Sequence, residues 1–350
     1  MNTDAKGILA YVPASFGRTV SFMLPDERWY HRAVNFWTEC TPTATRDFLD
    51  KRFRQGDFMS EWTIGIIGGS GLYAIDALEE AQWIPVQSPW GEPSDEILCG
   101  RIGHVRVRFL PRHGRGHRIA PSTINARANI DALKRAGCTD ILAISAVGSL
   151  SEELAPGRFV AVDQFIDNTK GRASSFFGDG FVAHVSMADP VCQRLSKHAV
   201  RSVAIAGGEC AEGATYLAME GPQFSTRAES RLYRHWGAEL IGMTGMPEAK
   251  LAREAELPYA LMAMVTDYDS WRDKEAAVDV SDILETMHAN GEIARKAIEK
   301  LCALLPDRRE PSPIDTALEY AIITAPEQRD ATLMTKLDAV AGRVLNGSEN

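Results

Sequence analysis

The sequence predicts an α/β protein whose central mixed β-sheet is flanked by helices. Two observations lead to this fold class. From Trp62 onward, short apolar segments rich in β-branched residues alternate with amphipathic helical patterns, and several of these segments end in glycine turns. The clearest is WTIGIIGGSGLY (residues 62–73), where an expected strand breaks at Gly68-Gly69-Ser70-Gly71. Such a turn can direct consecutive N–H groups at an anion. Taken alone, it is compatible with a nucleotide cofactor, a free phosphate or tight packing.

The composition is that of a soluble globular protein. Of the 350 residues, 45% are hydrophobic and 24% are charged, and the net charge of −9 disfavours a general nucleic-acid binder without excluding a local anion site. No apolar segment approaches the roughly 20 residues that span a membrane, and Pro13, Gly17 and Arg18 interrupt any signal-peptide core. We therefore expect a cytoplasmic protein with neither nucleic-acid nor membrane partners.

The cysteines are scattered and form neither a C-x-x-C pair nor a Cys/His cluster. This spacing is typical of reduced intracellular thiols rather than of a disulfide framework or a zinc site. We therefore expect no metal site built on them. The six cysteines are Cys40, Cys99, Cys138, Cys192, Cys210 and Cys302.

The sequence pattern divides the chain into three parts. Residues 1–58 show no sustained period, and two interpretations stay open: a mis-assigned or poorly ordered extension with Met59 as the true start, or an added structural arm. Residues 59–305 form the main α/β domain. Residues 306–350 form a polar linker and a helical tail, with one amphipathic helix expected over roughly residues 331–345, packed on the main domain or on a partner subunit.

Local signals mark the elements of the main domain. Gly103 indicates a hairpin turn, Gly137 follows a helix, Thr226 with Glu229 forms a capping box, and Pro247 suits a first helical turn. Strands are expected at residues 62–67, 96–101, 105–110, 141–147, 159–162, 215–219, 240–243 and 259–266, and helices at 125–137, 226–237, from 247 onward and at 280–301.

Polar and aromatic side chains follow six of these strands. Because parallel strands bind ligands outside their carboxyl ends, we expect them to line one pocket at one edge of the sheet. Taken singly, each has a structural interpretation as a cap, turn, core residue or surface pair. Together, a guanidinium with an imidazole suits phosphate oxygens, and two carboxylates suit acid–base chemistry. The residues are Ser70, Arg112, His113, Ser145, Ala146, Phe224, Ser225, Met243, Thr244, Asp267 and Asp269.

Six motifs in order resemble those of methylthioadenosine phosphorylases, a family within the purine nucleoside phosphorylases. The resemblance runs from about Trp62 to about Leu305. It implies a single-domain α/β fold, a homotrimer, and phosphorolysis of S-methyl-5′-thioadenosine with inorganic phosphate as co-substrate and no cofactor. The motifs are IGIIGGSGLY (64–73), RHGRGH (112–117), SAVGSL (145–150), EGPQFSTRAES (220–230), MTGMPEAKLARE (243–254) and TDYDSW (266–271).

The resemblance also implies a role for each matching residue. The phosphate site would comprise Ser70, Arg112, His113, Ser145, the backbone of Ala146 and Thr244; the purine site would comprise Phe224, Ser225, Asp267 and Asp269. Met243 would pack on the ribose, His117 would lie on a loop over the site, and Val280, Ile283, Leu284 and a neighbouring subunit's His184 would form the 5′ pocket. Two departures, Ala126 for Tyr and Asn168 for Arg, put subunit contacts in doubt more than chemistry.

The resemblance assigns the acid–base role to the carboxylate pair. Asp267 would be the general acid toward purine N7, which requires a raised pKa that burial beside Asp269 would favour. Asp269 would accept from the 6-amino group or orient Asp267.

Three alternatives remain in view. An NAD-dependent dehydrogenase would explain the fit of residues 69–74 to G-x-G-x-x-A, but residues 86–89 offer no acid to hold a ribose. A noncatalytic nucleoside-binding module would not need phosphate ligands together with a carboxylate pair. The serious competitor is a relative acting on 6-oxopurine nucleosides such as S-methyl-5′-thioinosine, inosine or guanosine.

Overall fold

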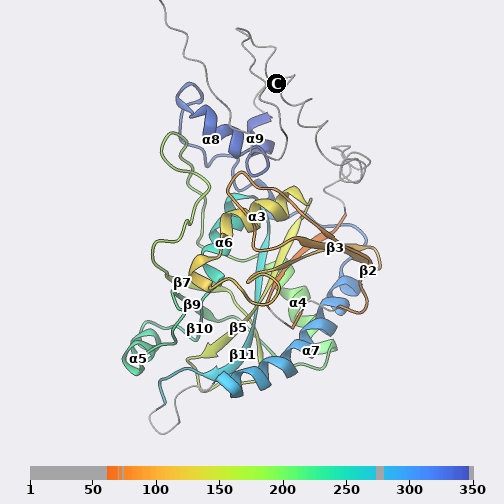
Figure 1. Ribbon diagram of the computed structural model, residues 1–350, viewed down its shortest axis with the longest axis vertical. Helices are drawn as coiled ribbons and strands as arrows, with labels where there is room; N and C mark the ends of the chain where they lie inside the picture. The colour runs from red at the N-terminus through yellow and green to blue at the C-terminus, as the bar shows by residue number, and fades with distance from the viewer. Residues whose placement is uncertain (1–60, 70, 73–74, 273–279, 347–350) are drawn as a thin grey trace, which may run out of the picture. The chain divides into compact units, whose positions relative to one another are not determined.

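The computed structural model describes residues 61–69, 71–72, 75–272 and 280–346, and gives only the backbone of 280–283. These residues belong to one compact unit, Met59–Asn350. Its eleven described strands form one mixed sheet with helices on both faces, which confirms the predicted fold class (Figure 1). The interpretations of residues 1–58 fall outside the described residues.

Parallel strands form the centre of the sheet. β1 (Thr63–Gly68) lies between β4 (Val105–Pro111) and β5 (Asp140–Ser149), and β11 (Tyr259–Tyr268) runs parallel to β5 on its other edge. All six residues of β1 are buried. A strand covered on both faces has no solvent side, so its sequence is almost continuously apolar.

An antiparallel meander extends the sheet beyond β4. β3 (Ile97–Ile102) and β4 form the predicted hairpin, in which Gly103 takes a positive φ of 59° that suits glycine. β2 (Glu79–Ile84), which the sequence analysis does not predict, pairs with β3 at the edge of the sheet.

The sheet splits along one edge of β5. β11 pairs with one edge of β5 along nearly the whole strand. The opposite edge of β5 is shared by β1 and β10 (Leu240–Gly242). β1 pairs with β5 as far as Ala143, and β10 pairs with it from Gly148 onward. Residues 144–147 of β5 therefore have no strand partner on this edge among the described residues, because β1 ends before them and β10 begins to pair after them.

The second half of the sheet corrects one expectation. β10 runs antiparallel to β5, and β9 (Thr215–Met219) runs parallel to β10. The sequence analysis expected the carboxyl ends of β9 and β10 at the same edge as those of the central parallel strands, and this is wrong. These two strands approach the split in β5 from the opposite direction. The remaining strands are β6 (Phe159–Ala161), β7 (Gln164–Asn168) and β8 (Cys210–Glu212).

Two pairs of helices cover the faces of the sheet. α3 (Ala126–Arg135) and α6 (Gly245–Glu254) pack into one hydrophobic core, and α4 (Gln193–Ile205) and α7 (Val280–Leu304) pack into the other (Figure 1). α4 was not predicted. Apart from two short helices in the tail, the remaining described helical segments are α5 (Arg227–His235) and the short 3₁₀ turns Pro121–Thr123, Pro313–Thr316 and Pro326–Gln328.

The predicted helix signals are present in the structure. Thr226 and Glu229 make the reciprocal capping box of α5. Asn125 caps α3 by accepting from the third residue of the helix. In α6 the regular helical backbone starts at Pro247, because Met246 has extended angles.

The prediction of one tail helix over residues 331–345 is wrong. The tail forms two short helices, α8 (Ala331–Lys336) and α9 (Gly342–Asn346). The N–H of Leu337 is shared between the carbonyls three and four positions earlier, so the helix tightens and ends there. Leu337, Val340 and Ala341 are buried in the same core as α3 and α6.

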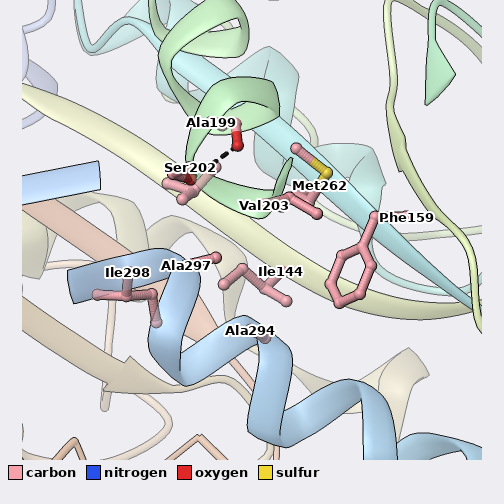
Figure 2. A pocket seen from close by; sticks show the side chains of 10 residues that line it. Ile144, Phe159, Ala199, Ser202, Val203, Met262, Ala294, Ala297 and Ile298 are labelled. Atoms are coloured by element: carbon pink, nitrogen blue, oxygen red, sulfur yellow. Dashed lines mark hydrogen bonds between the residues drawn. The ribbon is translucent and has the colours of Figure 1, made fainter. Parts of the chain in front are cut away.

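A small apolar cavity lies between the sheet and the helices α4 and α7 (Figure 2). Its volume of about 10 Å³ has room for about one water molecule. The Ser202 hydroxyl beside it donates to the Ala199 carbonyl at 2.7 Å. The cavity is therefore a packing defect rather than a nucleoside site. None of the described helices is both long and apolar enough to span a bilayer.

Candidate active site

Arg112 follows β4 and enters the split in β5. Its side chain is only 2% exposed and forms a two-bond salt bridge with Glu248, at 2.6 Å from Nε to Oε1 and 3.1 Å from Nη2 to Oε2. Nη1 donates to the carbonyl of Ile144 at 2.9 Å and Nη2 to that of Ile67 at 3.4 Å. These bonds use four of the five N–H groups of a guanidinium, which leaves one for an anion.

Glu248, in the first turn of α6, is a functional candidate that the sequence analysis does not identify. Its carboxylate also accepts from the Tyr259 hydroxyl at 3.2 Å. Burial is the largest single influence and lowers the pKa of Arg112, but the charge and hydrogen bonding of Glu248, together with Tyr259 and Tyr216, more than compensate, so that pKa is raised. The pair therefore holds a permanently charged guanidinium in one orientation. The only sequence signal was the position of Glu248 within the MTGMPEAKLARE motif.

His113 is buried beside Arg112 and carries no charge near neutral pH. Burial lowers its pKa to about 4. Its Nδ1 lies 2.9 Å from the carbonyl oxygen of Ile119, which can only accept, so Nδ1 carries the proton and Nε2 keeps a lone pair. The exposed ring of His117 stacks on it at 4.2 Å between centroids. The structure thus brings these two predicted site residues together.

Two hydroxyls from different strands meet at the split. Ser145 Oγ on β5 lies 3.3 Å from Thr244 Oγ1, which follows β10. Thr244 precedes α6 without capping it through its side chain. The backbone N–H groups of Thr244 and Gly245 donate to the Tyr216 hydroxyl, a contact that no sequence pattern indicated. Ser70 lies outside the described residues.

The carboxylate pair lies at the end of β11, which runs along the same strand, β5, that carries Ser145. A β-bulge at Thr266 shifts the register so that Asp267 pairs with Gly148. The Thr266 hydroxyl donates to Asp267 at 2.7 Å. A Cβ on Gly148 would lie 3.1 Å from Asp267 Oδ2 and 3.4 Å from the Cβ of Asp269. The absence of a side chain at residue 148 therefore leaves room for both carboxyl groups.

Burial raises the pKa of both carboxyl groups. The pKa of Asp267 is raised to about 6, mainly by burial with a smaller contribution from Asp269. Burial also raises the pKa of Asp269, although the hydroxyls of Ser230 and Ser225 oppose this. Among the described residues, Asp269 Oδ2 is buried without a hydrogen-bond partner. A buried acceptor without a donor is suited to a ligand N–H.

The expected base residues lie between β9 and α5, and the expected ribose residue directly follows β10. Phe224 is 48% exposed, and the Ser225 hydroxyl is buried against the Met219 sulfur at 3.8 Å. Met243 packs on Gly221 so closely that a Cβ at residue 221 would collide with its sulfur. These residues border the same split as the carboxylates and hydroxyls.

The structure describes only part of the predicted 5′ pocket, for which the histidine was expected from a neighbouring subunit. His184 is exposed, and its N–H donates to the carbonyl of Ala321 at 2.8 Å, in a segment apart from the described site contacts. Leu284 is 53% exposed. The side chains of Val280 and Ile283 lie outside the described residues.

The two departures noted in the sequence have local structural roles. Ala126 is the first residue of α3 and is buried in the core. The side-chain amide of Asn168, at the end of β7, donates to the Tyr233 hydroxyl at 3.3 Å.

An arginine- and hydroxyl-lined cage beside two buried carboxyl groups is the combination that phosphorolysis of a nucleoside requires. The chain belongs to the phosphorylase superfamily, whose family model matches residues 63–305. Its relatives within this superfamily include S-methyl-5′-thioadenosine phosphorylases, which confirms the family that the motifs indicate. That of Cereibacter sphaeroides is 58% identical over 286 residues, which cover 81% of this chain and 99% of the relative. That of Bradyrhizobium diazoefficiens is 54% identical and covers 83% and 100%.

Solved structures of relatives have the same fold. A methylthioadenosine phosphorylase from an Antarctic soil metagenomic library superposes with a TM-score of 0.76 at 48% identity, covering 80% of this chain and 99% of the relative. A mutant adenosine/methylthioadenosine phosphorylase from Schistosoma mansoni in complex with methylthioadenosine gives 0.65 at 36% identity, covering 70% and 91%.

Proposed function

We propose that this chain catalyses the phosphorolysis of S-methyl-5′-thioadenosine to adenine and 5-methylthioribose 1-phosphate. The observation that carries the proposal is the split along β5: Arg112 binds the Ile144 carbonyl, Ser145 meets Thr244, and Asp267 pairs with Gly148 farther along the same strand. The names of the curated relatives, at up to 58% identity over nearly their whole length, support the same reaction.

Phosphate is the nucleophile in this reaction, so the chain's task on that side is to bind and orient it. The remaining N–H of Arg112 and the hydroxyls of Ser145 and Thr244 are the donors for its oxygens, and the Ala146 backbone directly follows Ser145, whose hydroxyl contacts the Ala146 carbonyl. The unprotonated Nε2 of His113 can accept from a protonated phosphate oxygen. A preoriented anion in a water-poor site accelerates attack through positioning and electrostatics.

Adenine is a poor leaving group as an anion, so a proton is needed on the base. Asp267 is the general acid in the proposal, donating to purine N7. Its pKa of about 6 leaves a useful protonated fraction near neutral pH, and such a role is typically worth about 10²–10⁴-fold. The unpartnered Asp269 Oδ2 is the acceptor for the 6-amino group, which favours adenine over a 6-oxopurine.

The proposed reaction requires no cofactor or metal, because phosphate supplies the nucleophile and Asp267 the proton. We also propose a homotrimer in the cytoplasm. His184 lies apart from its own chain's site in a strip with exposed Val182, Tyr320 and Ile323, the second of which is 93% exposed. Such an apolar strip beside a histidine is suited to contact with a neighbouring subunit.

A side-by-side assay tests the proposal. Base release is followed with and without phosphate for S-methyl-5′-thioadenosine, adenosine, S-methyl-5′-thioinosine and inosine. The expected order places S-methyl-5′-thioadenosine first, with release that depends on phosphate. Preference for either 6-oxopurine would move the assignment to the competing substrate class, and absence of base release from all four would eliminate phosphorolysis.

A further inference from the structure

Arg172 lies on the segment between β7 and α4 and belongs to neither the phosphate site nor the base, ribose or 5′ sites. Its neighbours Gly171, Ala173 and Ser174 are exposed, yet its own side chain is only 7% exposed. A guanidinium that turns inward from an exposed segment loses hydration, which is recovered only through good hydrogen bonds. The hydrogen-bond partners of Arg172 therefore show which segments of the chain its side chain holds together.

The Arg172 guanidinium joins three backbone segments that border the site. Nε donates to Glu220 Oε2 at 3.0 Å, and Nη2 donates to the Glu220 backbone carbonyl at 2.7 Å. Nη1 donates to the carbonyls of Met243 at 2.6 Å and of Met246 at 3.2 Å. One side chain thus binds the end of β9, the end of β10 and the start of α6.

These contacts lie where the sheet no longer holds the two strands together. The parallel register of β9 and β10 ends at the pair Ala218 and Gly242. Beyond it, one segment leads to Phe224 and Ser225 at the proposed base site, and the other leads to Met243 and Thr244 at the proposed ribose and phosphate sites. Beyond this pair, the Arg172 guanidinium joins the two segments by binding the carbonyls of Glu220 and Met243, where β9 and β10 no longer pair with each other.

The residues before and after Arg172 in the chain are hydrogen-bonded to the protein, which fixes the position of the segment that carries it. The N–H of Lys170 donates to Glu220 Oε2 at 2.8 Å. Farther along, the Ser175 hydroxyl and the Phe176 N–H donate to the buried Glu254 carboxylate at the end of α6, at 2.7 and 2.6 Å. The segment is therefore anchored to the same helix whose start Arg172 binds.

We propose that Arg172 is a positioning residue that sets the base-binding segment 221–225 at the correct distance from Met243 and Thr244. The inference rests on the proposed phosphorolysis, in which one substrate must reach the acid and the phosphate at the same time. Free adenine needs only the first segment and free phosphate only the second. Loss of the fork should therefore spare both separate ligands and impair the nucleoside that joins them.

The test compares Arg172→Met, Arg172→Lys and Arg172→Ala with the wild-type chain. Arg343→Met is the matched control, because Arg343 makes a similar fork to Glu256 and Glu319 in the tail. Each variant is checked for folding by thermal unfolding. Adenine and phosphate binding are then measured by calorimetry, and kcat and KM for S-methyl-5′-thioadenosine are measured at saturating phosphate.

In Arg172→Met we expect kcat/KM to fall by about 10²-fold, because displacement of about 1 Å can have this effect. Affinities for adenine and phosphate alone should stay within about threefold. Arg172→Lys can keep the ion pair with Glu220 but cannot also reach the carbonyls of Met243 and Met246. Its kcat/KM should therefore remain about tenfold below that of wild type. Guanidinium ion at a non-denaturing concentration should restore part of the activity of Arg172→Ala.

Three outcomes would overturn the inference: activity of Arg172→Met within about threefold of wild type, loss of adenine and phosphate affinity in proportion to kcat/KM, or an equal loss in Arg343→Met. If Arg172→Met does not fold, the result for Arg172→Lys decides. A wild-type chain that performs no phosphorolysis overturns the proposed function as well, whereas an active wild type with an unaffected Arg172→Met overturns the positioning role alone.

Discussion

Replacement of Asp267 by asparagine should greatly slow turnover and stabilise the fold. Burial raises the pKa of this carboxyl from its ordinary 3.8 to about 6, so the folded state binds the proton more tightly than the unfolded state. Stability is therefore lost as pH rises from about 4 through 6 and stays low above that range. At about 1.4 kcal/mol per pKa unit, the charged form costs about 2–3 kcal/mol. Asp267→Asn removes this cost and keeps an acceptor for the Thr266 hydroxyl.

The assay combines denaturant unfolding with kinetics at several pH values. At pH 8, Asp267→Asn should be about 2 kcal/mol more stable than wild type, and the difference should vanish near pH 4. Its kcat should fall by about 10²–10⁴-fold. Asp179→Asn, at an exposed position, is the control for loss of one carboxylate. Unchanged stability at pH 8 would refute the buried charge, and turnover near that of wild type would refute the acid role.

Two further predictions concern the split in β5. Glu248→Gln leaves the buried Arg112 charge without its counterion, so chemical denaturation should show a loss of about 3–5 kcal/mol in the free energy of unfolding; a loss below about 1 kcal/mol would contradict the structural weight of the pair. Gly148→Ala puts a methyl group 3.1 Å from Asp267 Oδ2 and from an Ile241 methyl, so kcat should fall by at least about tenfold in a folded protein. Wild-type kcat in that variant would show that the carboxylates have room to move.

The features that the sequence predicted best are local ones. The strand before Gly68, the hairpin at Gly103 and the capping box of Thr226 and Glu229 each depend on residues a few positions apart. The chain also follows these signals in order, so eight of the eleven described strands and most of the longer helices could be predicted, whereas β2, β7 and β8 were missed. α4, whose N-cap Cys192 makes no side-chain capping bond, carried a weaker start signal.

The features that sequence reasoning missed depend on contacts between distant residues. The direction of β10 relative to β5 is decided by the path of the chain between them, which no short pattern encodes. The Arg112–Glu248 pair joins positions 136 residues apart. Arg172 binds three backbone carbonyls, and a carbonyl has no sequence signature because every residue carries one.

Asp267 differs from these cases because its position in the chain could be predicted from nearby residues, whereas its pKa depends on residues far away in the sequence. Its place after an apolar strand suggested a site, but its pKa depends on burial by segments remote in the sequence. The bulge at Thr266, which sets its register against Gly148, could not be read from the alternation of apolar residues.

The most direct test of the central claim is phosphorus NMR of the complete reaction. The purified full chain is incubated with S-methyl-5′-thioadenosine and inorganic phosphate, and adenine release is measured in parallel. The split-sheet site predicts a new sugar 1-phosphate signal that grows in a one-to-one ratio with adenine. Adenine release without that signal would indicate attack by water, and no adenine release at all would contradict the proposed phosphate cage and its carboxylic acid partner.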